Sequence, residues 1–243
     1  MATSRPHVFA EGFPKAPAAR WQLVRAFAER WCGARLPSNG ARDTNVRSLA
    51  IREWLALGRE LEAAGQPLRD GTPSLASLEE HAATSILLQA EGDLHWAVRN
   101  DAMSLADPPV YTFVLDYEGD RPEQFITCSP DPEHSSLSAF AIDYLASYMH
   151  TAGGGMTVEI GDAPASLTRL RSTFSSHAEL DGAFYFESDD LLVRVLPPRP
   201  RLGGWHLDVQ SLTRDRDGIP AFLLERARNG GAFSGVFIEE RNR

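Results

Sequence analysis

The chain has 243 residues, of which 43% are hydrophobic, 23% charged and 9% aromatic, proportions typical of a soluble globular protein. They exclude fibrous and disordered classes, and no apolar run approaches the ~18 residues that a membrane helix needs. The formal net charge is −9, from 24 basic and 33 acidic residues. Because the first residues lack the apolar centre of a signal peptide, we expect a cytoplasmic protein without a membrane partner.

The acidic excess lies in the middle of the chain. Residues 1–50 hold eight basic and three acidic residues, whereas residues 101–150 hold one arginine and nine acids. An acidic surface repels a phosphate backbone, which argues against nucleic acid as a partner, and it attracts and steers a basic protein. Such a run of charge is also typical of a solvated surface that aids solubility. The charge pattern leaves both interpretations open.

Two amphipathic helices are predicted in the first 65 residues. Apolar side chains recur at helical spacing within 19–37 and again within 48–65, and each run ends at glycine or proline. The polar, turn-rich stretch 37–46 between them predicts a loop. The apolar positions are Trp21, Val24, Phe27, Trp31, Ile51, Trp54, Leu55 and Leu61.

Strands are predicted next. The stretch 77–90 is ambiguous between a short helix and a strand, but residues 94–99 alternate with the period of a half-buried strand. The intervening "EGD" predicts a hairpin of 85–90 with 94–99. Residues 109–117 form the following strand, and its prolines can lie only before the strand pairing begins.

A helix is predicted at 135–155, with a serine at its start, glycines at its end and an apolar face of Leu137, Phe140, Tyr144, Leu145 and Tyr148. The glycine-rich "TAGGGMTVEIGD" that follows is interpreted as a loop. Further predicted elements are a helix at 165–175, strands at 182–187, 191–197 and 205–213, a helix at 219–230 and a strand at 232–240.

This order lacks regular βαβ alternation. It therefore predicts an α+β fold with a mainly antiparallel sheet flanked by helices and a C-terminal α+β extension. The predicted units are 17–150 and 156–243, and the second is either a separate domain or part of the same one.

Motifs of common enzymes and metal sites are absent from the sequence. The single lysine, Lys15, lies outside a phosphate-binding loop, no G-x-S-x-G occurs, and the seven histidines form no metal-binding pair. His95 and His206, each beside a tryptophan in a predicted strand, are interpreted as solvent-facing or hydrogen-bonded strand residues. Cys32 and Cys128 are interpreted as reduced, buried thiols. We therefore expect no metal, no cofactor and no catalytic residue. A hydrolase stays an alternative, because two catalytic carboxylates can meet in the folded chain without being close in the sequence.

The segment "LLQAEGDLHWAVRNDAMSLADPPVYTFVLD", followed by "SLSAFAIDYLASYM", resembles the SUKH superfamily, a group of small α+β proteins that includes many bacterial immunity proteins. Upstream, "ARLP" and "IREWLALG" are similar to the helix entry of that family, although "SNGARDTNV" is inserted between them. The resemblance covers roughly residues 21–150. The motif residues are Trp54, Gly92, Trp96, Asp107, Pro108, Pro109 and Phe140.

The resemblance implies a non-enzymatic protein that neutralises a cognate toxin by covering it. It gives the prolines a structural role, because they hold the chain extended as it enters the sheet, and Asp107 is expected to bond a nearby backbone N–H. The alternative from the eukaryotic relatives is a regulatory scaffold without a toxin. The residues expected to face a basic toxin domain are Asp116, Glu118, Asp120, Glu123, Asp131 and Glu133.

Overall fold

The structure is a computed structural model of the chain, which divides into two compact units. One unit is Lys15–Leu145, and the other combines Met1–Pro14 with Ala146–Arg243, so the division falls within a helix. The residues that the structure describes are 6–37, 46–90, 92, 94–116, 124–127, 130–153, 155–160, 163–198, 205–211 and 220–222.

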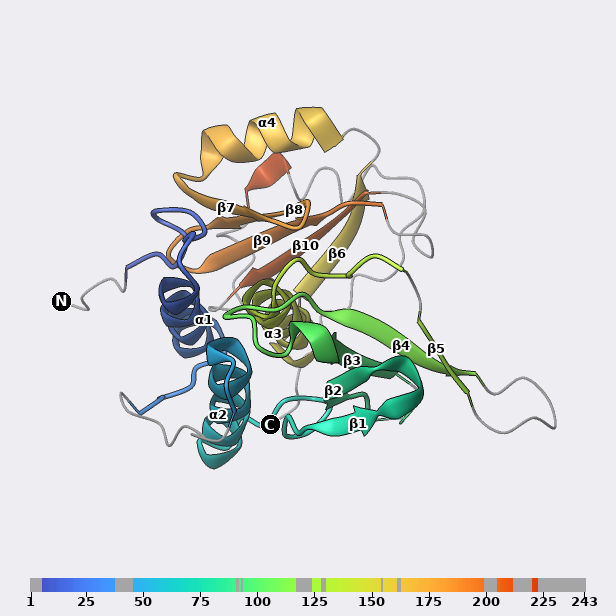
Figure 1. Cartoon of the computed structure of the whole chain (residues 1–243). Helices are drawn as coiled ribbons and strands as arrows, with labels where there is room; N and C mark the ends of the chain where they lie inside the picture. Colours follow the sequence, from blue (N-terminus) through green and yellow to red (C-terminus); the bar gives the residue numbers. More distant parts are fainter. Residues whose placement is uncertain are drawn as a thin grey trace. The chain divides into compact units, whose positions relative to one another are not determined.

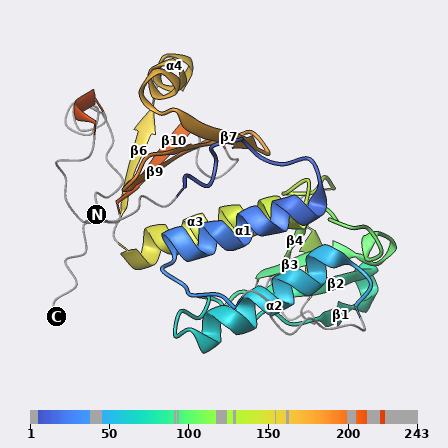
Figure 2. The same cartoon turned by 90° about the vertical axis from the view of Figure 1, so that its left-hand side faces the viewer.

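Two helices open the first unit, α1 (Pro17–Trp31) and α2 (Leu49–Ala63), and they lie side by side (Figure 2). Proline stands at the start of α1, where its missing N–H costs no hydrogen bond. The Ser48 side chain accepts the Ile51 N–H and caps α2. All eight predicted apolar positions are buried, which confirms both helices and their packed faces.

The first sheet is an antiparallel meander in the order β1-β2-β3-β4-β5 (Figure 1). The predicted hairpin of 85–90 with 94–99 is confirmed as β2 and β3. The stretch 77–90, ambiguous between helix and strand, contains both kinds of structure. It includes the end of a short strand and one 3₁₀ turn, Glu79–His81, and then β2. The strands are β1 (Ala76–Leu78), β2 (Ala83–Leu88), β3 (Leu94–Arg99), β4 (Tyr111–Asp116) and β5 (Gln124–Thr127).

The alternating strand β3 is buried on both faces, not on one as its pattern predicts. Its Ala97 joins Leu78, Ala83 and Phe113 in a small apolar cluster on one side of the sheet. His95 lies 2.9 Å from the Ser85 hydroxyl and is buried, so the pKa of its imidazole is lowered by desolvation. The hydrogen-bonded interpretation of this histidine is therefore the correct one of the two.

Helix α3 (Leu137–Gly153) begins in the first unit and ends in the second. Leu137, Phe140, Tyr144 and Leu145 are buried as predicted, while the side chain of Tyr148 lies outside the described residues. The Ser136 hydroxyl accepts the Ala139 N–H at 3.2 Å, a hydrogen bond that satisfies one of the unpaired donors of the first turn.

The second sheet has the order β6-β10-β9-β8-β7, and every neighbouring pair is antiparallel. Its central strand β9 is buried along its whole length. Helix α4 (Ala163–Thr173) covers one face (Figure 1), where Leu167, Leu170 and Phe174 pack against apolar side chains of the sheet. The strands are β6 (Gly155–Ile160), β7 (Ser176–Leu180), β8 (Ala183–Glu187), β9 (Leu191–Leu196) and β10 (Trp205–Ser211).

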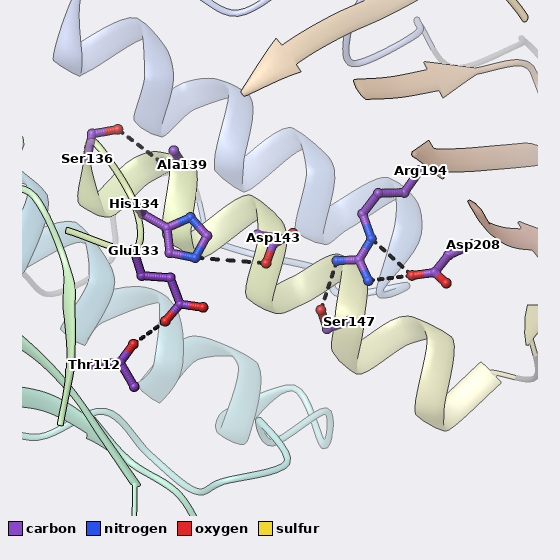
Figure 3. A network of polar contacts seen from close by, with 9 residues as sticks. All are labelled: Thr112, Glu133, His134, Ser136, Ala139, Asp143, Ser147, Arg194 and Asp208. Atoms are coloured by element: carbon purple, nitrogen blue, oxygen red, sulfur yellow. Dashed lines mark hydrogen bonds and ion pairs between the residues drawn. The ribbon is translucent and has the colours of Figure 1, made fainter. Parts of the chain in front are cut away.

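The other face of this sheet holds a buried ion pair. Arg194 of β9 and Asp208 of β10 are direct cross-strand neighbours, and the Arg194 guanidinium donates from Nη2 to Asp208 Oδ2 at 2.6 Å (Figure 3). The same guanidinium donates to the Ser147 hydroxyl of α3 at 2.8 Å. Both charged side chains are about one-twentieth exposed. Hydrogen bonds therefore compensate part of the desolvation of the two charges.

Several predicted elements need correction. The stretch interpreted as a loop after α3 contains β6, which pairs with β10 in an antiparallel register from Trp205↔Ile160 to Gln210↔Gly155. The sequence does not predict β5 and β7, because both are short and β7 is rich in polar residues. The predicted helix at 219–230 is described only at 220–222, and the strand at 232–240 lies outside the described residues. The α+β class with antiparallel sheets is confirmed.

Candidate protein-binding surface

The aromatic residues of the sequence motifs meet in the interior of the first unit. The rings of Trp54 in α2 and Trp96 in β3 both contact Phe140 in α3, with centroids 5.5 and 5.7 Å apart. Tyr144, one turn further along α3, contacts both tryptophans edge-on. Such edge-on and tilted contacts add to the free energy of burial. These motif residues therefore hold α2, β3 and α3 together.

Polar atoms of the same cluster are hydrogen-bonded. The Trp54 indole N–H donates to the Ile86 carbonyl at 3.1 Å, which ties α2 to β2. The Tyr144 hydroxyl donates to Asp70 Oδ2 at 2.7 Å and accepts the Asp70 N–H at 3.2 Å. Burial, and next the hydrogen bond to the Asp70 carboxylate, raise the pKa of Tyr144, so the phenol stays protonated and keeps this bond.

Asp107 joins the start of α3 to α1. Its carboxylate accepts the Ser138 N–H at 3.0 Å and the Ser138 hydroxyl at 2.5 Å. It also forms an ion pair with Arg20 at 3.2 Å, and its side chain is only 4% exposed. The bonded N–H lies 31 residues away in sequence, at the start of α3, and not in the turn of Asp107 itself as the sequence predicts.

Replacing Asp107 by alanine is expected to lower the free energy of unfolding by about 2 to 4 kcal/mol, because a helix cap and a charge-assisted hydrogen bond are lost together. Asp107→Asn keeps an acceptor for the Ser138 N–H and should lose less. Urea unfolding followed by tryptophan fluorescence measures both. Asp101→Ala, at an exposed position, is the control and should change stability by less than about 0.5 kcal/mol. An equal loss in the control would refute this role.

The other motif residues lie in turns. Gly92, in the hairpin turn between β2 and β3, has a φ of 84°, a conformation that favours glycine. Pro108 is buried and Pro109 half-buried, and both precede β4. Pairing begins directly after them, since Val110 bridges to His134. The position of the prolines before the paired strand agrees with the sequence.

The six acids expected to face a partner are only partly described. Glu118, Asp120 and Glu123 lie outside the described residues, and Asp116 ends β4 with its side chain likewise not described. Asp131 and Glu133 are exposed in the segment that leads into α3. Glu133 accepts a hydrogen bond from the Thr112 hydroxyl of β4, which fixes its carboxylate beside the sheet (Figure 3).

The sheet topology brings further acids to the same end as Glu133. Ala83 at the start of β2 pairs with Arg99 at the end of β3, and the Asn100 N–H donates to the Ala82 carbonyl at 2.8 Å. β4 also begins at this end, where Val110 bridges to His134. Five exposed carboxylates extend from this end of the sheet, and we call them the acidic end of the first sheet: Glu79, Glu80, Asp101, Asp131 and Glu133.

Basic and aromatic side chains border this end. The Arg99 guanidinium lies over the Tyr111 ring, 4.6 Å from its centroid. In this cation–π contact the electron-rich face of the ring attracts the positive charge. His81 packs against Phe113, with ring centroids 5.3 Å apart. Sequence reasoning missed Glu79, Glu80 and Asp101 as members of the acidic end, because they are 32 to 54 residues from Glu133 in the chain. Only the strand register brings them to one end.

Two other acids, Glu53 and Glu60 of α2, share one arginine and link two helices. Both bind Arg25 of α1, at 3.7 and 2.5 Å. Arg25 also donates to the Pro37 carbonyl at 2.9 Å. These bonds hold the guanidinium between the two helices, so the acids fasten α1 to α2.

In the described part of the chain, no group of three His, Cys, Asp or Glu side chains could hold a metal ion. Burial raises the pKa of the Cys32 thiol to about 12, which keeps this buried cysteine protonated and weakly reactive. Cys128 lies outside the described residues. Within the same ranges, no helix has the length and apolar character to cross a membrane.

Compared with family models, with curated proteins and with solved structures, the chain shows no match.

Proposed function

We propose that this protein is a non-enzymatic binding protein that neutralises a basic toxin domain, as the resemblance to SUKH immunity proteins implies. The observation that carries the proposal is the convergence of the motif residues. Trp54, Trp96 and Phe140 pack together, and Asp107 caps the helix that bears Phe140. Motif residues far apart in the sequence thus build one centre, which supports the resemblance as more than a chance series of short matches.

The partner-binding surface in this proposal is the acidic end of the first sheet. Five carboxylates extend from short turns that the sheet and the start of α3 hold in place. A basic toxin, for example a nuclease with a phosphate-binding face, is attracted to such a surface and cannot bind nucleic acid while that face is covered. Rigid attachment of the turns limits the entropy that binding removes.

The direct test is co-expression with toxin domains encoded beside this gene. The proposal expects one of them to arrest growth alone, to be tolerated together with this chain, and to copurify with it as a stable complex. Protection by this chain without a complex would indicate another mechanism. Absence of both protection and binding for every neighbouring toxin would contradict the proposal, and an isolated gene would favour a regulatory scaffold.

Neutralising the acidic end is expected to slow association with the toxin about tenfold at low ionic strength, with a much smaller effect at high salt. The variant combines Asp101→Asn, Asp131→Asn and Glu133→Gln, and stopped-flow or surface binding measures its association rate. A control variant, Glu62→Gln, Glu179→Gln and Asp190→Asn, removes the same charge from exposed positions elsewhere. Equal rates for the two variants would assign the attraction to net charge alone.

A further inference from the structure

We propose that the second unit contains a recognition site for a short, turn-forming peptide with an aromatic anchor, and that the N-terminal segment, residues 6–14, occupies this site as an internal ligand. The segment belongs to the second unit although the whole of Lys15–Leu145 separates it from the rest of that unit in the chain. The inference is independent of the proposed function, because none of its residues belongs to the acidic end of the first sheet.

Phe9 is the anchor of the segment. Its side chain is fully buried, and its ring lies against Tyr185 of β8 with centroids 5.5 Å apart. The Phe9 backbone N–H donates to Glu187 Oε2 at 3.1 Å, and the Glu187 side chain is itself 1% exposed. An aromatic ring in contact with a ring of the sheet, together with a main-chain donor on a buried carboxylate, is a built site for one residue of a peptide.

A second contact lies two residues before the anchor. His7 Nε2 is 3.1 Å from Asp189 Oδ1, in the turn that follows β8. His7 and Phe9 thus both contact β8 or the turn that follows it. Because the Asp189 side chain is 68% exposed, this contact contributes specificity more than affinity.

The anchor lies within a turn that spans residues 8–11. The Gly12 N–H donates to the Phe9 carbonyl at 3.0 Å, and Gly12 has a φ of 72°, so the turn depends on glycine. The recognised stretch is therefore short and ends at this turn. Its contacts lie on Tyr185, Glu187 and Asp189.

These contacts define the class of ligand. The site takes a short, turn-forming peptide with a buried aromatic side chain and, two residues earlier, a histidine or another hydrogen-bond donor that faces an acid. Peptide-recognition sites combine main-chain hydrogen bonds with pockets for particular side chains. A tethered ligand of this kind acts at an effective concentration of roughly millimolar. A partner peptide must therefore displace the N-terminal segment before it can bind.

The test uses the full chain and a fluorescent peptide with the sequence of residues 6–13. The Phe9→Ala variant vacates the aromatic position, so it should bind the peptide saturably and at least ten times more tightly than the wild-type chain, whose site is occupied. A peptide with alanine at the position of Phe9 should bind neither protein. Fluorescence anisotropy measures all four combinations.

A folding measurement covers the case in which Phe9→Ala loses structure. The peptide should then restore its circular dichroism spectrum and raise its melting temperature with peptide concentration, as mass action requires. Phe9→Leu, which keeps an apolar side chain without the ring, should respond in the same direction. A variant that is folded yet binds no peptide, or an unfolded one that the peptide does not rescue, would overturn the proposal. Equal affinity of wild type and Phe9→Ala would do so too.

Discussion

Replacing Trp54 by alanine is expected to lower the free energy of unfolding by about 3 to 5 kcal/mol, the range for truncating a large buried aromatic side chain. The side chain is fully buried and contacts Phe140 and Tyr144 of α3. Its indole N–H also binds the Ile86 carbonyl in β2. The substitution therefore leaves a cavity and removes a buried hydrogen bond at the same point.

Urea unfolding followed by tryptophan fluorescence is the measurement, because four of the five tryptophans lie in the first unit and report on it. Trp54→Phe separates the two contributions, since it keeps most of the ring and loses the donor. We expect it to cost about 1 to 3 kcal/mol. A loss below about 1 kcal/mol for Trp54→Ala would show that this cluster does not hold α2, β2 and α3 together.

Breaking the ion pair in the second sheet is expected to have an effect of similar size. Arg194→Met leaves Asp208 charged and buried, with its guanidinium partner removed, and should cost about 3 to 5 kcal/mol. The Ser147 hydroxyl loses its donor in the same variant. The physical cause is the desolvation of the buried Asp208 carboxylate once its guanidinium partner is lost, and the loss of Coulomb attraction is secondary.

A double variant distinguishes these causes. Arg194→Met combined with Asp208→Leu removes both charges, so it should be more stable than Arg194→Met alone. Thermal unfolding by circular dichroism compares the three proteins. Arg171→Met is the matched control, since Arg171 is exposed and lies over the Phe184 ring; it should cost less than about 1 kcal/mol. A double variant less stable than Arg194→Met would show that the buried Asp208 charge is not what destabilises Arg194→Met.

The helices show how much local pattern determines. The apolar positions of α1, α2 and α3 recur at helical spacing, and those with described side chains are buried. The sequence also predicts the strands β2, β3, β4, β8, β9 and β10, since β-branched and aromatic residues are concentrated in them. Period and composition are properties of neighbouring residues, so the sequence reports them directly.

The missed strands show where local pattern fails. β6 begins in a run of glycines after a helix, and its pairing with β10 joins segments about fifty residues apart. β7 alternates buried and exposed residues but contains serine, histidine and glutamate in five positions. Likewise, the alternation in β3 predicts that one face of the strand is exposed to solvent, yet His95 on that face is buried. Burial of an edge or a second face depends on which distant segment covers it.

By itself the sequence determined the α+β class, the three long helices, most strands and the residues of the aromatic and proline motifs. Only the tertiary structure decided which of these residues meet: Asp107 with Ser138 and Arg20, and Phe9 with Glu187. Only the strand register brought the acids of the first sheet to one end. The reason is physical, because propensity and periodicity act between near neighbours, whereas these contacts join residues 31 to 178 positions apart.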